Sequence, residues 1–265
     1  MEYKQIKVDS VLKKITKKDV LFNGDYIVDP YQNCEFGCLY CDSSFDTTIY
    51  VKVNSDEIIE DELRKQEKGR VIIGSVHDPY QEIEKKYKIT QEILKIIKKY
   101  GYTAHILTKS DLVLRDMNLI KNIKDSIVTI SVISLDKKIY NLFENNLPSP
   151  KKRFEIIKKL RKNSIFSGIA IMPVLPYLVE EELERLIKKS KEYNSNYVLF
   201  KHLELKGDQK QIFLKIIKDF FPGIYKDYKS LYESSFIPNE KYILNLNEKV
   251  SRIFKQVNIS NEIKI

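Results

Sequence analysis

The chain is poor in cysteine, lacks tryptophan and has no long apolar run. Only three of its 265 residues are cysteines. Three thiols cannot all pair with one another, and a reducing compartment would keep them as thiols, so a disulfide framework is the least attractive interpretation. No apolar stretch approaches the roughly 20 residues that cross a bilayer, and residues 1–19 alternate charged with apolar residues, unlike a signal peptide. We therefore expect a cytoplasmic protein with no membrane partner.

The composition is that of an ordinary globular protein. Hydrophobic residues make up 43% and charged residues 31% of the chain, which is enough to bury a core. The formal net charge of +9 comes largely from lysines spread along helix-like segments such as 85–100. Such lysines form either a solvated helix face or an electrostatic footprint for nucleic acid.

Apolar, β-branched runs alternate with amphipathic helices from residue 70 onward. We predict strands over 25–30, 71–76, 103–108, 126–133, 167–175 and 197–205. One predicted helix carries Ile89, Ile93, Ile96 and Tyr100 on one stripe and ends at Gly101. A second carries a stripe of Phe154, Ile157 and Leu160. Apolar strands separated by helices indicate a parallel sheet, either a (β/α) barrel or an open doubly wound sheet.

The same pattern divides the chain into three parts. Residues 1–25 are expected to be an N-terminal extension, 26–206 the core domain, and 207–265 a helical and then irregular extension that caps the core. Pro173 and Pro176 are expected to lie at the end of the fifth strand, because proline cannot continue a sheet ladder, and this favours a loop over the active site. His105 and His202 lie within apolar strands, where core or barrel-lining histidines are the default.

All three cysteines fall within eight positions, directly after the first predicted strand. Cys34, Cys38 and Cys41 have the spacing C-x3-C-x2-C. A structural zinc would need a fourth ligand, which one of the histidines would have to supply. A [4Fe-4S] cluster normally takes four thiolates, and three would leave one iron open for chemistry. From the residues alone, both metal sites stay open.

This loop resembles the signature of the radical S-adenosylmethionine (radical SAM) superfamily. The resemblance rests on the spacing, on Tyr40 just before the last cysteine, and on the position after the first strand. It implies a partial (β/α)6 TIM-like barrel in which Cys34, Cys38 and Cys41 bind a [4Fe-4S] cluster. It further implies that SAM is cleaved reductively to a 5′-deoxyadenosyl radical, which takes hydrogen from a substrate.

Further stretches are similar to the superfamily branch related to spore photoproduct lyase. They lie at 74–90, 106–116 and 130–160. In the lyase a cysteine returns a hydrogen atom to the repaired thymine, whereas this chain has Ser75 at that position. The lyase has a tyrosine after its last cluster cysteine, where this chain has Asp42. These departures imply a substrate other than spore photoproduct.

The resemblance also assigns roles to residues outside the cysteines. The Tyr40 backbone would face the adenine of SAM while its ring packs. His77 would hydrogen-bond the methionyl amino group, or is a structural histidine at a strand end. Lys109 would contact the SAM carboxylate or ribose. Ser131 would reach the ribose, or is an inward-facing strand serine.

Several other residues are secondary candidates. Glu144 and Arg153 resemble a pair usual in this branch, and either brace the loop or contact a ligand. Tyr80 and Glu82 follow the second strand and are candidates to face substrate, with Tyr80 and Tyr87 as candidate radical quenchers. Asp78 precedes a proline and is equally a turn residue.

The expected function is that of a radical SAM enzyme, whether lyase-like, a transferase or an oxidoreductase. Its expected partners are SAM, a reductant such as flavodoxin or ferredoxin, and a nucleic acid or nucleotide substrate. A peptide or small-molecule substrate is the alternative within the same chemistry. The alternative from another class is a zinc-containing, non-catalytic nucleic-acid-binding protein.

Overall fold

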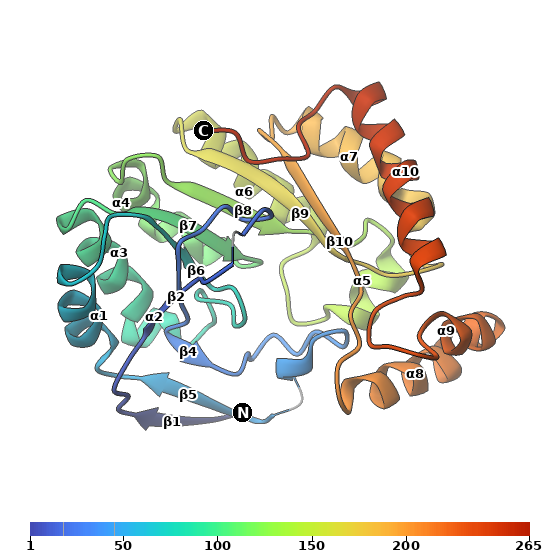
Figure 1. Cartoon of the computed structure of the whole chain (residues 1–265), viewed down its shortest axis with the longest axis horizontal. Coiled ribbons are helices and arrows are strands. Elements are labelled where there is room, and N and C mark those ends of the chain that lie inside the picture. Colours follow the sequence, from blue (N-terminus) through green and yellow to red (C-terminus); the bar gives the residue numbers. More distant parts are fainter. Residues whose placement is uncertain (18, 45) are drawn as a thin grey trace.

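The computed structural model describes residues 1–17, 19–44 and 46–265. Its main sheet has seven strands in the order β10-β9-β8-β7-β6-β3-β2, and all neighbours are parallel except the β2–β3 pair (Figure 1). The strands are β2 (Leu12–Lys14), β3 (Tyr26–Val28), β6 (Arg70–Ile73), β7 (Thr103–Thr108), β8 (Ile127–Ser131), β9 (Phe166–Val174) and β10 (Val198–His202). Six parallel strands with helices between them confirm the predicted partial (β/α)6 barrel.

Several strands end earlier than predicted: those predicted over 25–30, 126–133 and 197–205 end at Val28, Ser131 and His202. The predicted strand 71–76 already ends at Ile73, because Gly74 turns the chain with a φ of +86°. Pro173 lies at the end of the fifth strand, as predicted, since β9 ends one residue later at Val174. The ladder accommodates the missing N–H by an irregular register, in which Ile171 pairs with Phe200 but Val174 pairs with His202.

Ten α-helices are present among the described residues, and those between the parallel strands cover the outer face of the sheet (Figure 1). They are α1 (Ser55–Arg64), α2 (Glu84–Tyr87), α3 (Ile89–Lys99), α4 (Met117–Lys121), α5 (Lys137–Phe143), α6 (Pro150–Lys162), α7 (Leu183–Glu192), α8 (Gln209–Phe220), α9 (Tyr225–Leu231) and α10 (Glu240–Val257). Short 3-10 turns occur at η1 (Asp42–Ser44), η2 (Asp111–Asp116), η3 (Glu180–Glu182) and η4 (Pro222–Ile224).

The helices follow the local sequence signals. In α6 the N-cap Ser149 side chain accepts from the Lys152 amide at 3.4 Å, and Phe154, Ile157 and Leu160 are fully buried as predicted. In α3 the buried stripe is Ile89, Ile93 and Ile97, whereas the predicted stripe members Ile96 and Tyr100 are only half-buried. Gly101 follows this helix with a φ of +68°, as its predicted position at the helix end requires.

Buried side chains fill the inside of the barrel. Ile127, Ala170, Tyr197 and Leu199 form a buried cluster on β8, β9 and the region of β10, against which Phe22 packs. His105 is fully buried beside it, with Nδ1 2.9 Å from the Phe22 carbonyl oxygen and Nε2 2.7 Å from Thr129 Oγ1. His105 is thus a core histidine, as expected for a histidine on an apolar strand, while His202 is half-buried.

A second, small sheet carries the cysteine loop, and the sequence pattern did not predict it. Its order is β1-β5-β4, built from β1 (Glu2–Ile6), β4 (Tyr31–Gln32) and β5 (Thr48–Lys52). The cysteine loop connects β4 to β5. The first strand of the chain therefore supports the segment that holds the thiols (Figure 1).

The C-terminal segment after β10 forms α8, α9 and α10. Helix α8 packs on α9, and α10 packs on α7 along the barrel (Figure 1). The last residues return to the sheet, where Tyr197 and Ser260 form an isolated parallel bridge. Among the described residues, no helix combines the length and the apolar character that a membrane crossing requires.

Candidate active site

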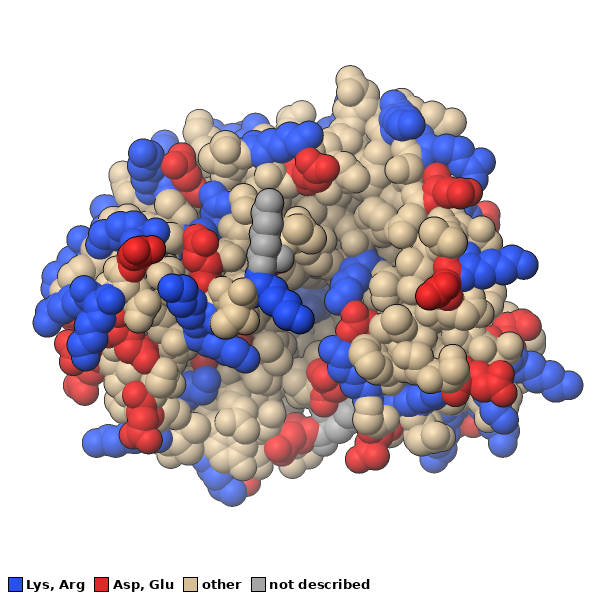
Figure 2. All heavy atoms as spheres, in the orientation of Figure 1, with Lys and Arg blue, Asp and Glu red and all other residues tan. Residues whose placement is uncertain are grey.

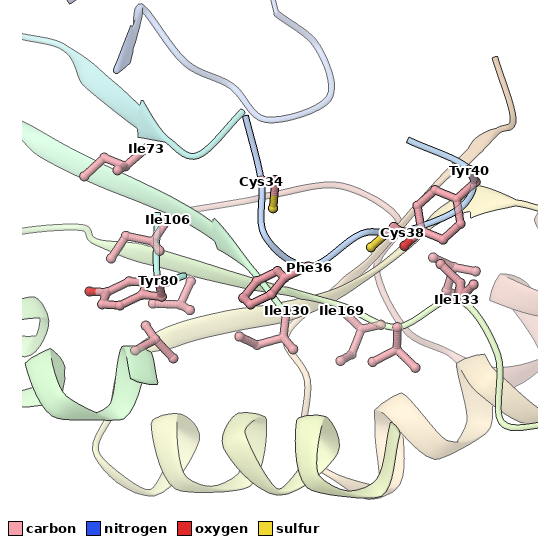
Figure 3. Close-up of a cluster of buried hydrophobic side chains, with 14 of the residues drawn as sticks. Cys34, Phe36, Cys38, Tyr40, Ile73, Tyr80, Ile106, Ile130, Ile133 and Ile169 are labelled. Carbon is pink, nitrogen blue, oxygen red and sulfur yellow. The ribbon is translucent and has the colours of Figure 1, made fainter. Parts of the chain in front are cut away.

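The three thiols lie on one loop at the carboxyl ends of the parallel strands. Figure 3 shows Cys34, Phe36, Cys38 and Tyr40 along this loop, beside the strands that carry Ile106, Ile130 and Ile169. Gly37 gives the loop its turn with a φ of +63°, and the Cys41 amide donates to the Cys38 carbonyl at 2.9 Å. Cys34 and Cys38 are buried and Cys41 is half-buried, and all three are free thiols.

A cavity of about 130 Å³ joins this loop to the strand ends. Its lining comes from the segment before β3, from the cysteine loop, from β7, β8 and β9, and from the loops after β6 and β7: Phe22, Cys34, Phe36, Cys38, Cys41, Ser43, Gly74, Ser75, Val76, Asp78, Leu107, Thr108, Lys109, Ser131, Ala170 and Met172. The structure thus brings together five of the seven predicted site residues, Cys34, Cys38, Cys41, Lys109 and Ser131. Tyr40 and His77 lie beside the cavity and do not line it.

The thiols and Lys109 share one electrostatic environment. Burial raises the pKa of Cys34 to about 11 and that of Cys38 to about 12, and the Lys109 cation opposes both shifts. Burial also lowers the pKa of Lys109, but its electrostatic interactions with Cys38, Glu144 and Asp78 outweigh burial and hold that pKa above its usual value. Lys109 therefore remains a cation at the end of β7, where it favours an anionic group in the cavity.

Tyr40 anchors the loop through its side chain. Its ring is buried, and its hydroxyl donates to Glu144, whose other oxygen accepts from the Arg153 guanidinium. Arg153 also donates to the carbonyl oxygens of Pro148 at 2.9 Å and Ser131 at 2.8 Å. Glu144 and Arg153 therefore form the bracing ion pair that the sequence offered as one of two roles, and they connect the cysteine loop to the end of β8.

The loop after β6 is held by two aspartates. Asp78 is buried and accepts from the Thr108 hydroxyl at 2.7 Å, the Lys109 amide at 2.7 Å and the Tyr80 amide at 2.9 Å. Asp78 is thus more than a turn residue, because it ties this loop to the end of β7. Asp29 accepts from the Val76 amide at 3.2 Å. Asp29 was not among the predicted site residues.

His77 lies in this same loop and is half-buried. Its amide donates to Asp29 at 3.4 Å, while its Nδ1 is buried without a hydrogen-bond partner among the described residues. Burial lowers the pKa of His77, so the ring is neutral near pH 7. A neutral imidazole with an unused nitrogen can serve as a donor or an acceptor for a bound ligand.

The secondary tyrosine and glutamate candidates lie away from the cavity. Tyr80 is fully buried, and its hydroxyl donates to Asp116 at 3.1 Å. Glu82 is exposed and pairs with Lys85 at 2.5 Å, and the Tyr87 hydroxyl accepts from a glutamine of β1. None of these three side chains lines the cavity, so the structure gives them no contact with a substrate there.

The donor set fits an iron–sulfur cluster. Across 1–17, 19–44 and 46–265, no three or more His, Cys, Asp or Glu side chains are grouped so as to hold one metal ion. In a four-iron cluster each thiolate binds its own iron, so the three ligands need not converge on one point. Three free thiols on one loop, lining one cavity beside the Lys109 cation, meet that requirement.

A partial barrel with three thiols and a cavity at its strand ends has the geometry expected of a protein that binds a metal cluster beside a ligand. Residues 28–189 match the family model of the radical SAM superfamily, and the chain belongs to this superfamily of enzymes. Members of the superfamily use a [4Fe-4S] cluster and SAM. The fold class, the family and the cofactors predicted from the sequence are thereby confirmed.

The chain is also similar to uncharacterized relatives and to solved structures that share its fold. An uncharacterized protein of Methanocaldococcus jannaschii is 32% identical over 211 residues, which cover 76% of this chain and 78% of that protein. An uncharacterized protein of Mycobacterium tuberculosis is 26% identical over 257 residues, which cover 89% of this chain and 76% of that protein. A variant of spore photoproduct lyase with bound AdoMet and dinucleoside spore photoproduct has a TM-score of 0.71 at 16% identity, covering 96% of this chain and 79% of that one. At that identity the likeness shows the fold.

Proposed function

We propose that Cys34, Cys38 and Cys41 bind a [4Fe-4S] cluster and that the adjoining cavity binds SAM. The observation that carries this proposal is the single cavity lined by all three thiols together with Lys109 and Ser131. When bound, the cluster and SAM supply a one-electron reductive cleavage of the sulfonium, which gives methionine and a 5′-deoxyadenosyl radical. The electron comes from a reductant such as flavodoxin or ferredoxin.

The chain's own residues bind and orient SAM. We assign Lys109 to the SAM carboxylate, because a cation held among buried groups favours an anion. Ser131 ends β8 with its hydroxyl available to the ribose. The Tyr40 backbone is assigned to the adenine, and His77, neutral with an unused Nδ1, to the methionyl amino group. The buried Tyr40, Glu144 and Arg153 chain keeps the loop in place while SAM binds.

The favoured substrate is a nucleic acid or a nucleotide other than spore photoproduct. The fold is that of spore photoproduct lyase, and the formal charge of +9 suits phosphate groups. Figure 2 shows a hollow in one face of the molecule with Lys and Arg side chains at its rim. Ser75 lines the cavity where the lyase has its hydrogen-donating cysteine, and a serine O–H bond is too strong for that role. A peptide or small molecule is the alternative substrate.

The first experiment is anaerobic reconstitution with iron and sulfide, followed by dithionite reduction in the presence of SAM. We expect brown protein that forms 5′-deoxyadenosine, and a variant with all three cysteines changed to Ala that forms none. Lys98→Met, on the exposed face of α3, controls for the loss of an unrelated side chain. Colourless wild-type protein that contains zinc and forms no 5′-deoxyadenosine would establish the zinc-containing binding protein instead.

A second experiment addresses the substrate class. Nucleic acid and peptides are prepared from cells grown in deuterated water, and each is added to the reduced enzyme with unlabelled SAM. Hydrogen abstraction transfers deuterium from the substrate to 5′-deoxyadenosine, which mass spectrometry detects. We expect deuterium with the nucleic acid fraction. Transfer with peptides alone would assign the enzyme to the alternative class.

A further inference from the structure

Gln81 contacts the beginning of the cysteine loop with both ends of its carboxamide. The side chain is fully buried. Its Oε1 accepts from the Glu35 amide at 2.8 Å, and its Nε2 donates to the Asn33 carbonyl at 3.0 Å. These two backbone groups flank Cys34 on either side. Gln81 thereby supplies hydrogen-bond partners for backbone groups that have no β-sheet partner in this stretch of the loop.

Gln209 contacts the end of the same loop. It is the first residue of α8, it is buried, and its Nε2 donates to the carbonyl oxygen of Tyr40, the residue before Cys41. The helix is itself fixed against the loop, because Phe213 stacks on Phe143 with ring centroids 5.7 Å apart. The Phe143 carbonyl in turn accepts from the Leu39 amide at 3.1 Å.

We propose that Gln81 and Gln209 are positioning residues that hold the cysteine loop in its cluster-binding shape before any metal arrives. This inference rests on the proposed function, which makes Cys34, Cys38 and Cys41 the ligands. Both carboxamides are neutral, so they fix the backbone without repelling the thiolates that form on metal binding. Because Gln209 belongs to α8, the C-terminal segment contributes directly to the site.

The physical gain is preorganisation. An open loop would have to lose its conformational freedom when the cluster binds, and that entropy would be subtracted from the binding free energy. When two buried side chains already hold the loop, its conformational entropy is lost as the protein folds and not when the cluster binds. Removing one of them is expected to make the loop open more often while the barrel stays folded.

The test uses the metal-free full chain and a thiol reagent, 5,5′-dithiobis(2-nitrobenzoic acid). In the wild type, half-buried Cys41 is expected to react fast, and buried Cys34 and Cys38 slowly. Gln81→Met and Gln209→Met retain the side-chain length but lose the hydrogen bonds. Each is expected to accelerate the slow thiols roughly three- to tenfold, the effect of losing one buried neutral hydrogen bond. Gln211→Met, at an exposed position of the same helix, should react as the wild type does.

Thermal unfolding followed by circular dichroism separates loop opening from loss of the fold. Faster labelling of Cys34 and Cys38 at an unchanged melting temperature supports the proposal. Unchanged labelling, or acceleration that only parallels a fall in melting temperature, overturns it. Since labelling needs no metal, these outcomes decide the inference even if the wild type binds no cluster.

The reconstituted protein gives a second signature that a merely structural role would not alter. In Gln209→Met we expect the electron paramagnetic resonance spectrum of the reduced cluster to respond less to added SAM, because the Tyr40 backbone beside Cys41 is no longer fixed. Gln211→Met should keep the wild-type response. An identical response in both variants argues against positioning by Gln209, whatever the rate of 5′-deoxyadenosine formation.

Discussion

Glu144 and Arg153 form an ion pair inside the protein, and changing Glu144 to alanine should destabilise the fold strongly. Both residues are 1% exposed. Burial lowers the pKa of Arg153, but Glu144, together with Tyr40 and Cys38, raises it above its usual value, so the guanidinium stays charged. Without Glu144 that charge keeps only its two carbonyl partners, at 2.8 and 2.9 Å. Breaking a buried pair in this way costs about 3–5 kcal/mol.

In a protein of this size, 1 kcal/mol moves the melting temperature by about 2–4 °C, so Glu144→Ala should melt roughly 6–20 °C lower. Urea unfolding of the metal-free protein measures the free energy directly. Glu184→Ala, which removes an exposed pair with Lys188, is the control and should cost less than about 1 kcal/mol.

A double variant tests the physical cause. Arg153→Met removes the buried charge, so Glu144→Ala combined with Arg153→Met should recover much of the stability that Glu144→Ala alone loses. The reasoning is refuted if Glu144→Ala unfolds within 1 kcal/mol of the wild type. It is equally refuted if the double variant is as unstable as the less stable single variant.

Three further predictions address pH, backbone strain and SAM binding. Burial lowers the pKa of His105 to about 3 from 6.5, so the unfolded chain binds more protons between these values and stability falls as the pH drops below 6.5. Urea unfolding should show about 2 kcal/mol less stability at pH 5 than above pH 6.5. If the unfolding free energy of His105→Gln falls with pH as steeply as that of the wild type, the prediction is contradicted. Gly74→Ala would place a methyl 2.7 Å from the Leu107 carbonyl oxygen at a φ of +86°, so it should cost at least about 1–3 kcal/mol, and an unaltered melting temperature would speak against it. Lys109→Met should weaken SAM binding about tenfold or more in anaerobic calorimetry, with Lys98→Met as the control, and equal affinities would remove Lys109 from the SAM site.

The barrel strands were predictable because each carries its own signal. A strand of a parallel sheet is covered on both faces, so its sequence is locally apolar. The prediction for 103–108 coincides with β7, and all six predicted strands occur. The small sheet lacked any such signal. Strand β1 is almost wholly exposed and β4 has only two residues, so neither has a pattern that stands out from a loop.

The site was predictable only where its residues are neighbours in sequence. The spacing of the cysteines is set by the chain itself and could be recognised directly. The contacts that hold their loop join residues far apart, because Gln81 reaches Glu35 across 46 positions and Gln209 reaches Tyr40 across 169. For Tyr80 the sequence pattern was misleading. Its position after a strand suggested a substrate contact, but its side chain is buried and its hydroxyl donates to Asp116. Local patterns carry no information about such partners.

The cysteine loop and the barrel depend on different kinds of interaction, and this should decide which fails first. The barrel is held by a large set of fully buried apolar side chains, each of which contributes roughly 1.5–3 kcal/mol. The loop buries fewer side chains, among them Phe36 and Tyr40, and otherwise depends on long-range hydrogen bonds to single side chains, each with a net contribution of about 1 kcal/mol. Mild destabilisation should therefore open the loop while the barrel remains folded. The same segment must admit iron and sulfide, so a low local stability there is compatible with cluster assembly into a protein that is already folded.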